Sequence, residues 1–336
     1  MKRVLVTHAD EPIGRRVVKC LFHDPEVEAL FLVGSGPTPR SFDRYLAQDG
    51  PAVRYARVAL SRHRPASDLF HSAAFREFEI DSVVHLPQHG ATSVPSAPAL
   101  GGLDARTAEV RLVLQHCLET PTIRHLVALG SAFVYKLQPG NANRLTEDSE
   151  LDFDPKIDPE QKAWVDADMI IHGEVHNDRL RVVLLRAPTV VAAGGDAYLN
   201  PALQGRSRRA RPLGFDPMCA VISDKDTARA LQAAVHSDRP GIYNVAGREA
   251  VPFSQLARWT GRAAWAVPSP ILGWTRIALP WSGGRSAPAP LSRSLRYGFT
   301  LDTQRAEREL GFAPGDRIGL ARAGDGSLRL ETASSA

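Results

Sequence analysis

Two hydroxyl side chains, Ser131 and Tyr135, stand four residues apart at the end of an apolar run. Such a pair could polarise a carbonyl or hydroxyl group and carry a proton to or from it. A phenol needs a neighbouring cation to do this near neutral pH, because its ordinary pKa is about 10. None of the six tyrosines has a lysine four residues after it, and no tyrosine stands between Tyr135 and Tyr198. The sequence therefore lacks a Tyr-x-x-x-Lys proton donor.

The composition is that of a globular protein. Of the 336 residues, 43% are hydrophobic and 23% are charged, which allows a sizeable core. The net charge of +4 is small and does not indicate nucleic-acid binding. Three widely spaced cysteines lack metal-ligand spacing and favour free thiols in a reducing cytoplasm. The chain starts on a strand pattern and holds no apolar run of about 18 residues, so we expect neither a signal peptide nor a transmembrane segment.

Strand-like and helix-like patterns alternate along the chain. The elements that they predict must position Ser131 and Tyr135. Apolar runs predict strands at 4–7, 29–33, 53–60, 82–86, 125–130 and 180–185. Helical spacing occurs at 14–22, 103–119 and 165–177. Apolar strands separated by helices are typical of a parallel sheet that is buried on both faces. Right-handed crossovers then give an α/β fold with a doubly wound, Rossmann-like sheet.

The amino-acid composition changes after Pro188, where glycine, proline and arginine become frequent. We predict a core over residues 1–190 that returns at about 220–247, through a helix at 224–236 and a strand at 242–245. Residues 191–219 and 248–314 would form a smaller C-terminal lobe. The tail at 315–336 is rich in Gly, Ser, Ala and charge, and we expect it to be poorly ordered.

Seven short segments of the chain, taken in their order along the sequence, carry a resemblance to one known family. They are Val4–Thr7 with Ile13-Gly14, Ser82–Pro87, Leu129–Tyr135, Leu184–Pro188, Ile222–Ala230, Gly241–Ala246 and Tyr297–Phe312. Together they resemble the extended short-chain dehydrogenase/reductases, the NAD-dependent epimerase/dehydratase family, over roughly residues 1–314. The resemblance implies a dinucleotide-binding core, a substrate-side lobe and a homodimer formed through the helices near 103–119 and 165–177. Fold alone does not settle function.

The glycine turn of that family is degenerate here. Its three glycine positions fall on His8, Glu11 and Gly14, and only Gly14 would allow close packing of helix on strand. Glu11 would place a carboxylate where phosphate oxygens lie, and two like charges at ~4 Å repel by roughly 1 kcal/mol in water. Asp10-Glu11-Pro12 is also typical of a helix start with its own acidic cap. Either the loop binds no dinucleotide tightly, or it is an altered loop that still works.

The end of the second strand carries no acid for the ribose hydroxyls of NAD. Ser35 and Arg40 follow it, and they favour NADP over NAD if either cofactor binds, although an ordinary surface loop is the preferred interpretation of these residues. We expect binding of NADP or NAD to be weak or absent. The cofactor-binding positions that the resemblance implies are Thr7, Glu11, Pro12, Ile13, Gly14, Ser35, Arg40, Leu86, Pro87 and Pro188.

In the family, a serine, a tyrosine and a lysine perform the proton transfer. Ser131 matches the family serine, whereas Trp164 and Asp168 stand at the positions of the tyrosine and the lysine. An indole N–H is no acid near neutral pH, and a carboxylate raises a neighbouring phenol's pKa instead of lowering it. Tyr135 is a weaker candidate proton donor. His85, His89 and His172 are the other possible acid/base groups, each with a structural role as the alternative.

Two segments of the smaller lobe could contact a ligand. The arginines at 206–211 could hold a phosphate or carboxylate, or form a solvated loop. The tryptophan- and proline-rich run at 265–281 could meet a membrane surface, or cover the pocket as a packed cap. We find no metal-ligand pattern in the chain.

Two functions are compatible with these observations. In the first, the protein has lost standard hydride transfer and acts in ligand binding, sensing or scaffolding with a small-molecule ligand. In the second, it is an atypical NAD(P)-dependent oxidoreductase or epimerase that acts on a small or lipid-like hydroxyl or carbonyl substrate through non-standard acid/base groups near Ser131. The losses at Glu11, Trp164 and Asp168 favour the first function.

Overall fold

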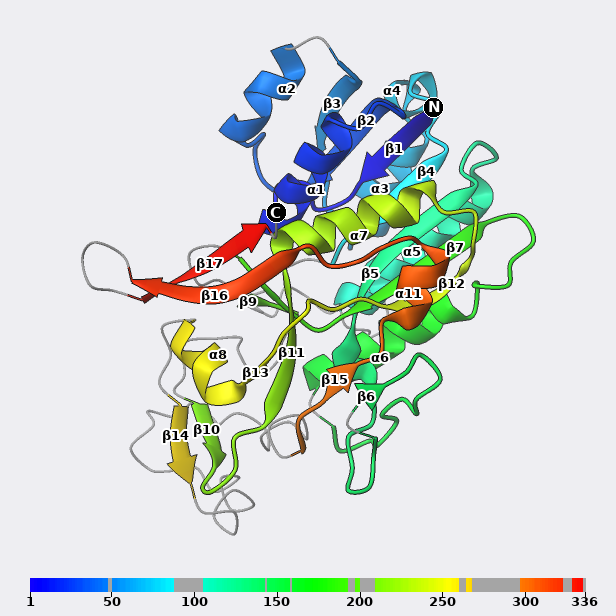
Figure 1. The fold of residues 1–336 in the computed structure, drawn as a ribbon. Helices are drawn as coiled ribbons and strands as arrows, with labels where there is room; N and C mark the ends of the chain where they lie inside the picture. The colour runs from blue at the N-terminus through cyan, green and yellow to red at the C-terminus, as the bar shows by residue number, and fades with distance from the viewer. Residues whose placement is uncertain are drawn as a thin grey trace, which may run out of the picture.

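The computed structural model describes residues 1–47, 50–87, 105–142, 144–157, 159–192, 197–199, 209–259, 264–267, 297–322 and 328–334. Its centre is a sheet of seven parallel strands in the order β12-β7-β5-β4-β1-β2-β3 (Figure 1). The strands are β1 (Lys2–Val6), β2 (Val27–Gly34), β3 (Ala52–Arg57), β4 (Ser82–His85), β5 (His125–Ser131), β7 (Arg181–Ala187) and β12 (Gly241–Asn244). The strand order reverses between β1 and β4. In such sheets the crevice at the carboxyl ends of the two switch-point strands is the usual ligand site.

Helices cover both faces of this sheet. α1 (Pro12–Phe22) and α7 (Asp224–His236) pack over one face, in a cluster that contains Val4, Val6 and Leu30. α3 (His63–Phe70), α4 (Ala73–Glu77), α5 (Ala105–Glu119) and part of α6 (Pro159–His172) pack over the other face, against Leu5 and Phe31. Alternate strand residues thus enter opposite layers, as the pleat of a strand requires. η1 (Arg40–Phe42) and α2 (Asp43–Ala47) link β2 to β3, and η3 (Ala132–Val134) follows β5.

A smaller set of elements lies beyond the carboxyl ends of the main sheet (Figure 1). β8 (Thr189–Val191), β9 (Ala197–Tyr198), β11 (Met218–Ser223) and β13 (Ala250–Pro252) form a four-stranded sheet, with α8 (Phe253–Trp259) packed beside it. β10 (Arg209–Pro212) pairs with β14 (Ala264–Val267), and β6 (Arg144–Leu145) pairs with β15 (Thr300–Leu301). α11 (Gln304–Glu309) follows β15.

The doubly wound parallel sheet predicted from the sequence is confirmed, with shifts at element ends. The helix expected at 165–177 starts at Pro159 and ends at His172, and the strand expected at 53–60 ends at Arg57. The helix expected at 224–236 has those bounds, because Ser223 caps it by accepting the Asp226 N–H.

The C-terminal residues differ from the expectation of a poorly ordered tail. β16 (Asp316–Arg322) and β17 (Leu328–Ser334) form an antiparallel hairpin. Its start is fixed to α7, because the Asp226 carboxylate accepts the backbone N–H groups of Gly315 and Asp316, each at 3.0 Å. Ser223 donates its hydroxyl to the Asp316 carboxylate at 2.9 Å. The composition of residues 315–336 did not indicate these buried hydrogen bonds to Ser223 and Asp226.

Across the described residues, none of the helices combines the length and the apolar character needed to cross a bilayer.

Candidate functional site

Thr7 closes the switch point by joining the ends of β1 and β4. Its backbone N–H donates to the Val84 carbonyl at 3.0 Å, and its hydroxyl accepts the Leu86 N–H at 2.9 Å. The same hydroxyl lies 3.1 Å from His85 Nδ1. Burial lowers the pKa of His85 to about 4, so this imidazole is neutral near pH 7. Thr7 and His85 therefore hold the two strand ends together, and Leu86 and Pro87 are buried behind them.

His8 and Glu109 form a buried pair between the end of β1 and α5. His8 has φ 48°, so it keeps the left-handed backbone that a glycine adopts without cost. Its Nε2 bonds the Glu109 carboxylate of α5, and both side chains are 5% exposed. Burial alone would lower the pKa of His8, but the Glu109 charge and hydrogen bond outweigh burial and raise it. Burial would likewise raise the pKa of Glu109, but the His8 charge outweighs it and lowers that pKa. Each partner of the pair thus favours the charged form of the other.

A second carboxylate, Asp10, lies at the end of β2. Its Oδ2 accepts the Gly36 N–H at 2.8 Å, and the Tyr55 hydroxyl donates to the Gly36 carbonyl at 2.7 Å. A Cβ on Gly34 would come within 2.4 Å of both Asp10 Oδ1 and the Tyr55 hydroxyl oxygen, so a larger residue there would have to displace these side-chain ends. Burial and the Asp10 charge raise the pKa of Tyr55 to about 12. An acid from the loop after β1 thus sits where a Rossmann fold holds the ribose of its cofactor.

The loop before α1 differs in part from the expectation. Glu11 is the N-cap residue of α1, but its side chain makes no capping hydrogen bond, so the predicted acidic cap is wrong for this residue. Pro12 stands at the start of the helix as predicted. A Cβ on Gly14 would lie 2.1 Å from the His8 carbonyl, which confirms that this glycine permits close packing. Burial and the nearby Asp10 raise the pKa of the half-buried Glu11.

The other predicted cofactor positions are scattered. Ser35 and Arg40 are exposed, and the Ser35 carbonyl accepts the Nε–H of Arg57 at 3.1 Å, not of Arg40. Ile13 belongs to α1 and is fully buried in the core. Pro188 is buried between β7 and β8. Of the predicted set, Thr7, Leu86 and Pro87 lie at the ends of β1 and β4, and Glu11, Pro12 and Gly14 lie in the loop and first turn of α1 that follow β1.

The two candidate hydroxyl groups are buried and already bonded. Ser131 Oγ donates to the Leu199 carbonyl and accepts the Phe133 N–H, each at 3.2 Å. The Tyr135 hydroxyl donates to Asn244 Oδ1 at 2.6 Å and accepts from Arg186 Nη1 at 3.1 Å. Burial raises the pKa of Tyr135 to about 12, although Arg186 opposes this rise.

Asp168, at the position of the family lysine, is held by Arg186 of β7. Arg186 Nε and Nη2 donate to the two carboxylate oxygens of Asp168 at 2.8 and 2.7 Å, and both side chains are 1% exposed. This is a bidentate ion pair inside the protein. Arg186 Nη1 also donates to the Glu147 carbonyl at 3.2 Å. Asp168 therefore belongs to a buried polar network that contains Tyr135, and is no free acid/base group.

Trp164, at the position of the family tyrosine, lies one helical turn before Asp168 on α6. The Arg106 guanidinium lies over its ring, 3.9 Å from the centroid. The side chain is buried, and its indole N–H has no hydrogen-bond partner among the described residues. Trp164 thus packs against α5 and offers a donor but no titratable proton.

Of the remaining candidates, one is exposed and the others lie wholly or partly outside the described residues. His172 is exposed on α6, and His89 lies outside the described residues. The arginines at 206–208 and the run at 268–281 also lie outside them, and only the backbone is described at 209–212 and 264–267. The part of the chain that the structure describes holds no group of three or more His, Cys, Asp or Glu side chains arranged for a metal ion.

Sequence reasoning missed Glu109, Tyr55 and Arg186, and it noted Asp10 only as part of a cap. Glu109 had a usable signal, since it falls among Ala108, Val110 and Leu112 on a helix with many buried residues. A carboxylate at a buried position needs a partner. The identity of that partner follows only from the fold.

Comparison with known proteins supports the fold. No family profile matches the chain. Uncharacterised proteins of Mycobacterium tuberculosis and Mycobacterium bovis are 26% identical over 331 residues, which is 93% of this chain and 80% of each relative.

Solved structures of low identity superpose over most of the chain. The dTDP-glucose 4,6-dehydratase of Bacillus anthracis in complex with NAD has a TM-score of 0.62 at 17% identity, and covers 94% of this chain and 92% of its own. The UDP-glucose 4-epimerase of Thermotoga maritima with UDP-glucose has a TM-score of 0.62 at 15% identity, with 93% of each chain covered. The UDP-glucuronic acid 4-epimerase of Bacillus cereus, in complex with UDP-glucuronic acid and NAD, has 0.63 at 15% identity, with 94% of each covered. The resemblance stated from the sequence is thus confirmed at the level of the fold.

Proposed function

We propose that this chain is a small-molecule-binding protein on the epimerase/dehydratase fold that has lost standard hydride-transfer chemistry. The observation that carries the proposal is the bidentate pair of Asp168 with Arg186. At the position where the family holds a lysine, this chain holds Asp168, whose carboxylate is paired with Arg186 inside the core. The helix that carries it holds no tyrosine. Proton transfer by a phenol next to a free ammonium group is therefore unavailable to this chain.

The contents of the crevice support weak or absent dinucleotide binding. A pyrophosphate at the switch point would approach the His8–Glu109 pair and the half-buried Glu11. Displacing one partner of a buried ion pair costs about 3–5 kcal/mol, because the other charge is left uncompensated. At the adenosine end, Asp10 Oδ2 accepts the Gly36 N–H, and Asp10 Oδ1 is buried without a hydrogen-bond partner among the described residues. The misfit therefore lies at the phosphate end, where the charges of His8, Glu109 and Glu11 do not fit a pyrophosphate without rearrangement.

A second candidate is an atypical NAD(P)-dependent oxidoreductase or epimerase. Its support is that solved neighbours of this fold contain NAD and nucleotide sugars and cover nearly the whole chain. Such an enzyme would need an acid/base group other than Trp164 and Asp168. Ser131 and Tyr135 are the hydroxyl candidates, and both would have to give up their present hydrogen bonds.

Titration with NADH and NADPH, followed by nicotinamide fluorescence, separates the two functions. We expect no saturation below about 1 mM, which corresponds to a binding free energy weaker than about −4 kcal/mol. The double variant with His8→Gly and Glu109→Gly removes both partners of the pair together, and we expect it to bind NADH or NADPH more tightly than the parent. Sub-millimolar binding by the parent protein would overturn the first proposal and favour the second.

A further inference from the structure

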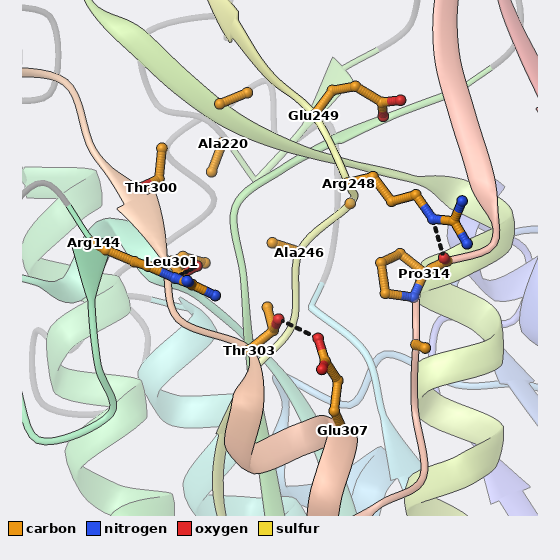
Figure 2. A pocket seen from close by; sticks show the side chains of 13 residues that line it. Arg144, Ala220, Ala246, Arg248, Glu249, Thr300, Leu301, Thr303, Glu307 and Pro314 are labelled. Atoms are coloured by element: carbon orange, nitrogen blue, oxygen red, sulfur yellow. Dashed lines mark hydrogen bonds between the residues drawn. The ribbon is translucent and has the colours of Figure 1, made fainter.

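A cavity of about 530 Å³ lies away from the switch point (Figure 2). It is bounded by β6 and β15, by α11, by residues 246–250 after β12, and by residues 313–314 before the hairpin. β12 is an edge strand of the main sheet, four strand spacings from β1. At about 4.8 Å per spacing, this places the edge strand roughly 19 Å from β1. The cavity is therefore separate from the crevice at β1 and β4.

Two arginines with restrained guanidinium groups face this cavity. Arg248 Nε donates to the Pro314 carbonyl at 2.8 Å, and Arg144 Nε donates to the Leu301 carbonyl at 3.4 Å (Figure 2). Arg144 Nε also lies 3.4 Å from the Asp302 carboxylate. Within the described ranges, the terminal amino groups of Arg144 and Arg248 make no hydrogen bond. A guanidinium held at Nε with a free terminal edge suits the planar recognition of a phosphate or a carboxylate.

The same cavity carries hydrogen-bond acceptors. Thr303 donates its hydroxyl to Glu307 Oε1 at 2.9 Å, which orients the Glu307 carboxylate along α11 (Figure 2). Glu249 Oε2 is a buried oxygen with no hydrogen-bond partner among the described residues. A buried carboxylate oxygen without a donor is costly, so a ligand that supplies an O–H or N–H would relieve this cost. The cavity thus combines anion donors with hydroxyl or ammonium acceptors.

We propose that this cavity binds a small metabolite that carries one phosphate or carboxylate group together with hydroxyl or ammonium donors. Arg248 binds the anion, Arg144 lines the opposite side of the cavity, and Glu249 and Glu307 accept the donors (Figure 2). This proposal does not depend on the fate of the dinucleotide site, because no residue is shared between the two.

Calorimetric titration with four probes tests the ligand class. Inorganic phosphate and acetate report the anion alone, whereas glycerol 3-phosphate and phosphoethanolamine add hydroxyl or ammonium donors. We expect a probe with both groups to bind more tightly than the matching bare anion, with a dissociation constant below about 1 mM. The comparison of phosphate with acetate shows which anion the cavity prefers.

Variants identify the site. R248Q should weaken the best probe by at least about tenfold, since hydrogen bonds to charged groups are worth about 1.5–3 kcal/mol. R308Q is the matched control, because Arg308 is also exposed and donates its Nε–H to a carbonyl, that of Gln304, but does not line the cavity. E249Q should reduce the advantage of phosphoethanolamine over phosphate and leave phosphate binding unchanged.

The proposal is overturned if none of the four probes binds at about 10 mM, a limit of about −3 kcal/mol. It is also overturned if R248Q binds as tightly as the parent, or if R308Q weakens binding as much as R248Q. If E249Q leaves the advantage of phosphoethanolamine intact, the part of the proposal that assigns donors to Glu249 is wrong.

Discussion

Arg186 of β7 donates hydrogen bonds to both carboxylate oxygens of Asp168 on α6, and this pair joins α6 to β7 in the protein interior. A buried ion pair of this kind adds little net free energy of folding, because its Coulomb energy is offset by the cost of desolvation. Removal of one partner, however, leaves an unpaired charge in the core. The remaining donors of Arg186 reach Tyr135 and the Glu147 carbonyl. The position that the resemblance assigns to catalysis is therefore part of the framework of this protein.

Removal of one partner should be costly. We expect Asp168→Ala to lower the free energy of unfolding in urea by about 3–5 kcal/mol, because the Arg186 charge stays buried without a counter-ion. Asp166→Ala, two residues earlier on α6 and only half-buried, serves as the control and should stay within about 0.5 kcal/mol of the parent. A change of similar size in both variants would contradict the structural role given to Asp168.

The His8–Glu109 pair should make stability depend on pH. The pKa of His8 is raised above its ordinary value of 6.5, so above pH 6.5 the unfolded chain loses a proton that the folded chain keeps. The stabilisation from His8 is full below pH 6.5 and declines as the pH rises through the folded-state pKa. Glu109 acts in the opposite direction, since its lowered pKa makes its contribution disappear as the pH falls below 4.5.

Urea unfolding of the parent and of Glu109→Gln, measured from pH 6 to pH 9, checks this sign. The parent should lose stability over that interval more steeply than the variant, because without the carboxylate burial lowers the pKa of His8. Neutral His85 contributes the opposite slope, and does so only between its folded pKa of about 4 and its ordinary value of 6.5. Parallel curves for the two proteins would show that His8 does not titrate through Glu109.

Removal of the Glu11 carboxylate should favour dinucleotide binding. Two like charges at ~4 Å repel by roughly 1 kcal/mol in water, so Glu11→Gly should strengthen NADPH binding by about fivefold. Glu11→Gln separates the effect of charge from that of backbone freedom. Asp68→Asn, a change to an exposed acid on α3 and outside the loop, controls for net charge. If both Glu11 variants bind NADPH no better than D68N, the electrostatic account of the loop is incorrect.

Gly14 should tolerate no side chain. A Cβ there would lie 2.1 Å from the His8 carbonyl and 2.7 Å from the Ala9 Cα, both of them backbone atoms. We expect Gly14→Ala to destabilise the protein by about 3 kcal/mol, the upper end of the usual cost of overpacking. Gly319→Ala in β16 adds the same methyl group where no atom lies within 4 Å, and thermal unfolding of the two variants gives the comparison. Equal melting temperatures would refute the close packing of α1 on this loop.

The layout of the fold could be predicted because it depends on local patterns. Apolar strands separated by helical periodicity fixed the parallel sheet, and the serine cap at Ser223 marked the start of α7. The bounds of α6 were less accurate, since its first turn carries Pro159 and Glu160 in place of an apolar face. Helix starts of this kind depend on caps and not on periodicity.

The partners of the buried charges could not be predicted. His8 and Glu109 are 101 residues apart, and they meet only because the strand order reverses between β1 and β4. The sequence did indicate that Glu11 and Asp168 were unusual at their positions, but it did not indicate that Asp10 bonds Gly36 or that Asp168 faces Arg186. The order of the C-terminal hairpin likewise depends on Asp226, some 90 residues before Asp316.

The left-handed backbone of His8 links the turn after β1 to α5. A mutation of His8 to glycine alone would keep the turn but leave the Glu109 carboxylate buried without its partner, and a mutation of Glu109 alone would leave the His8 imidazole buried without its acceptor. Each single change should therefore cost stability, whereas the double change removes both polar groups together. The two positions are thus expected to vary jointly and not one at a time.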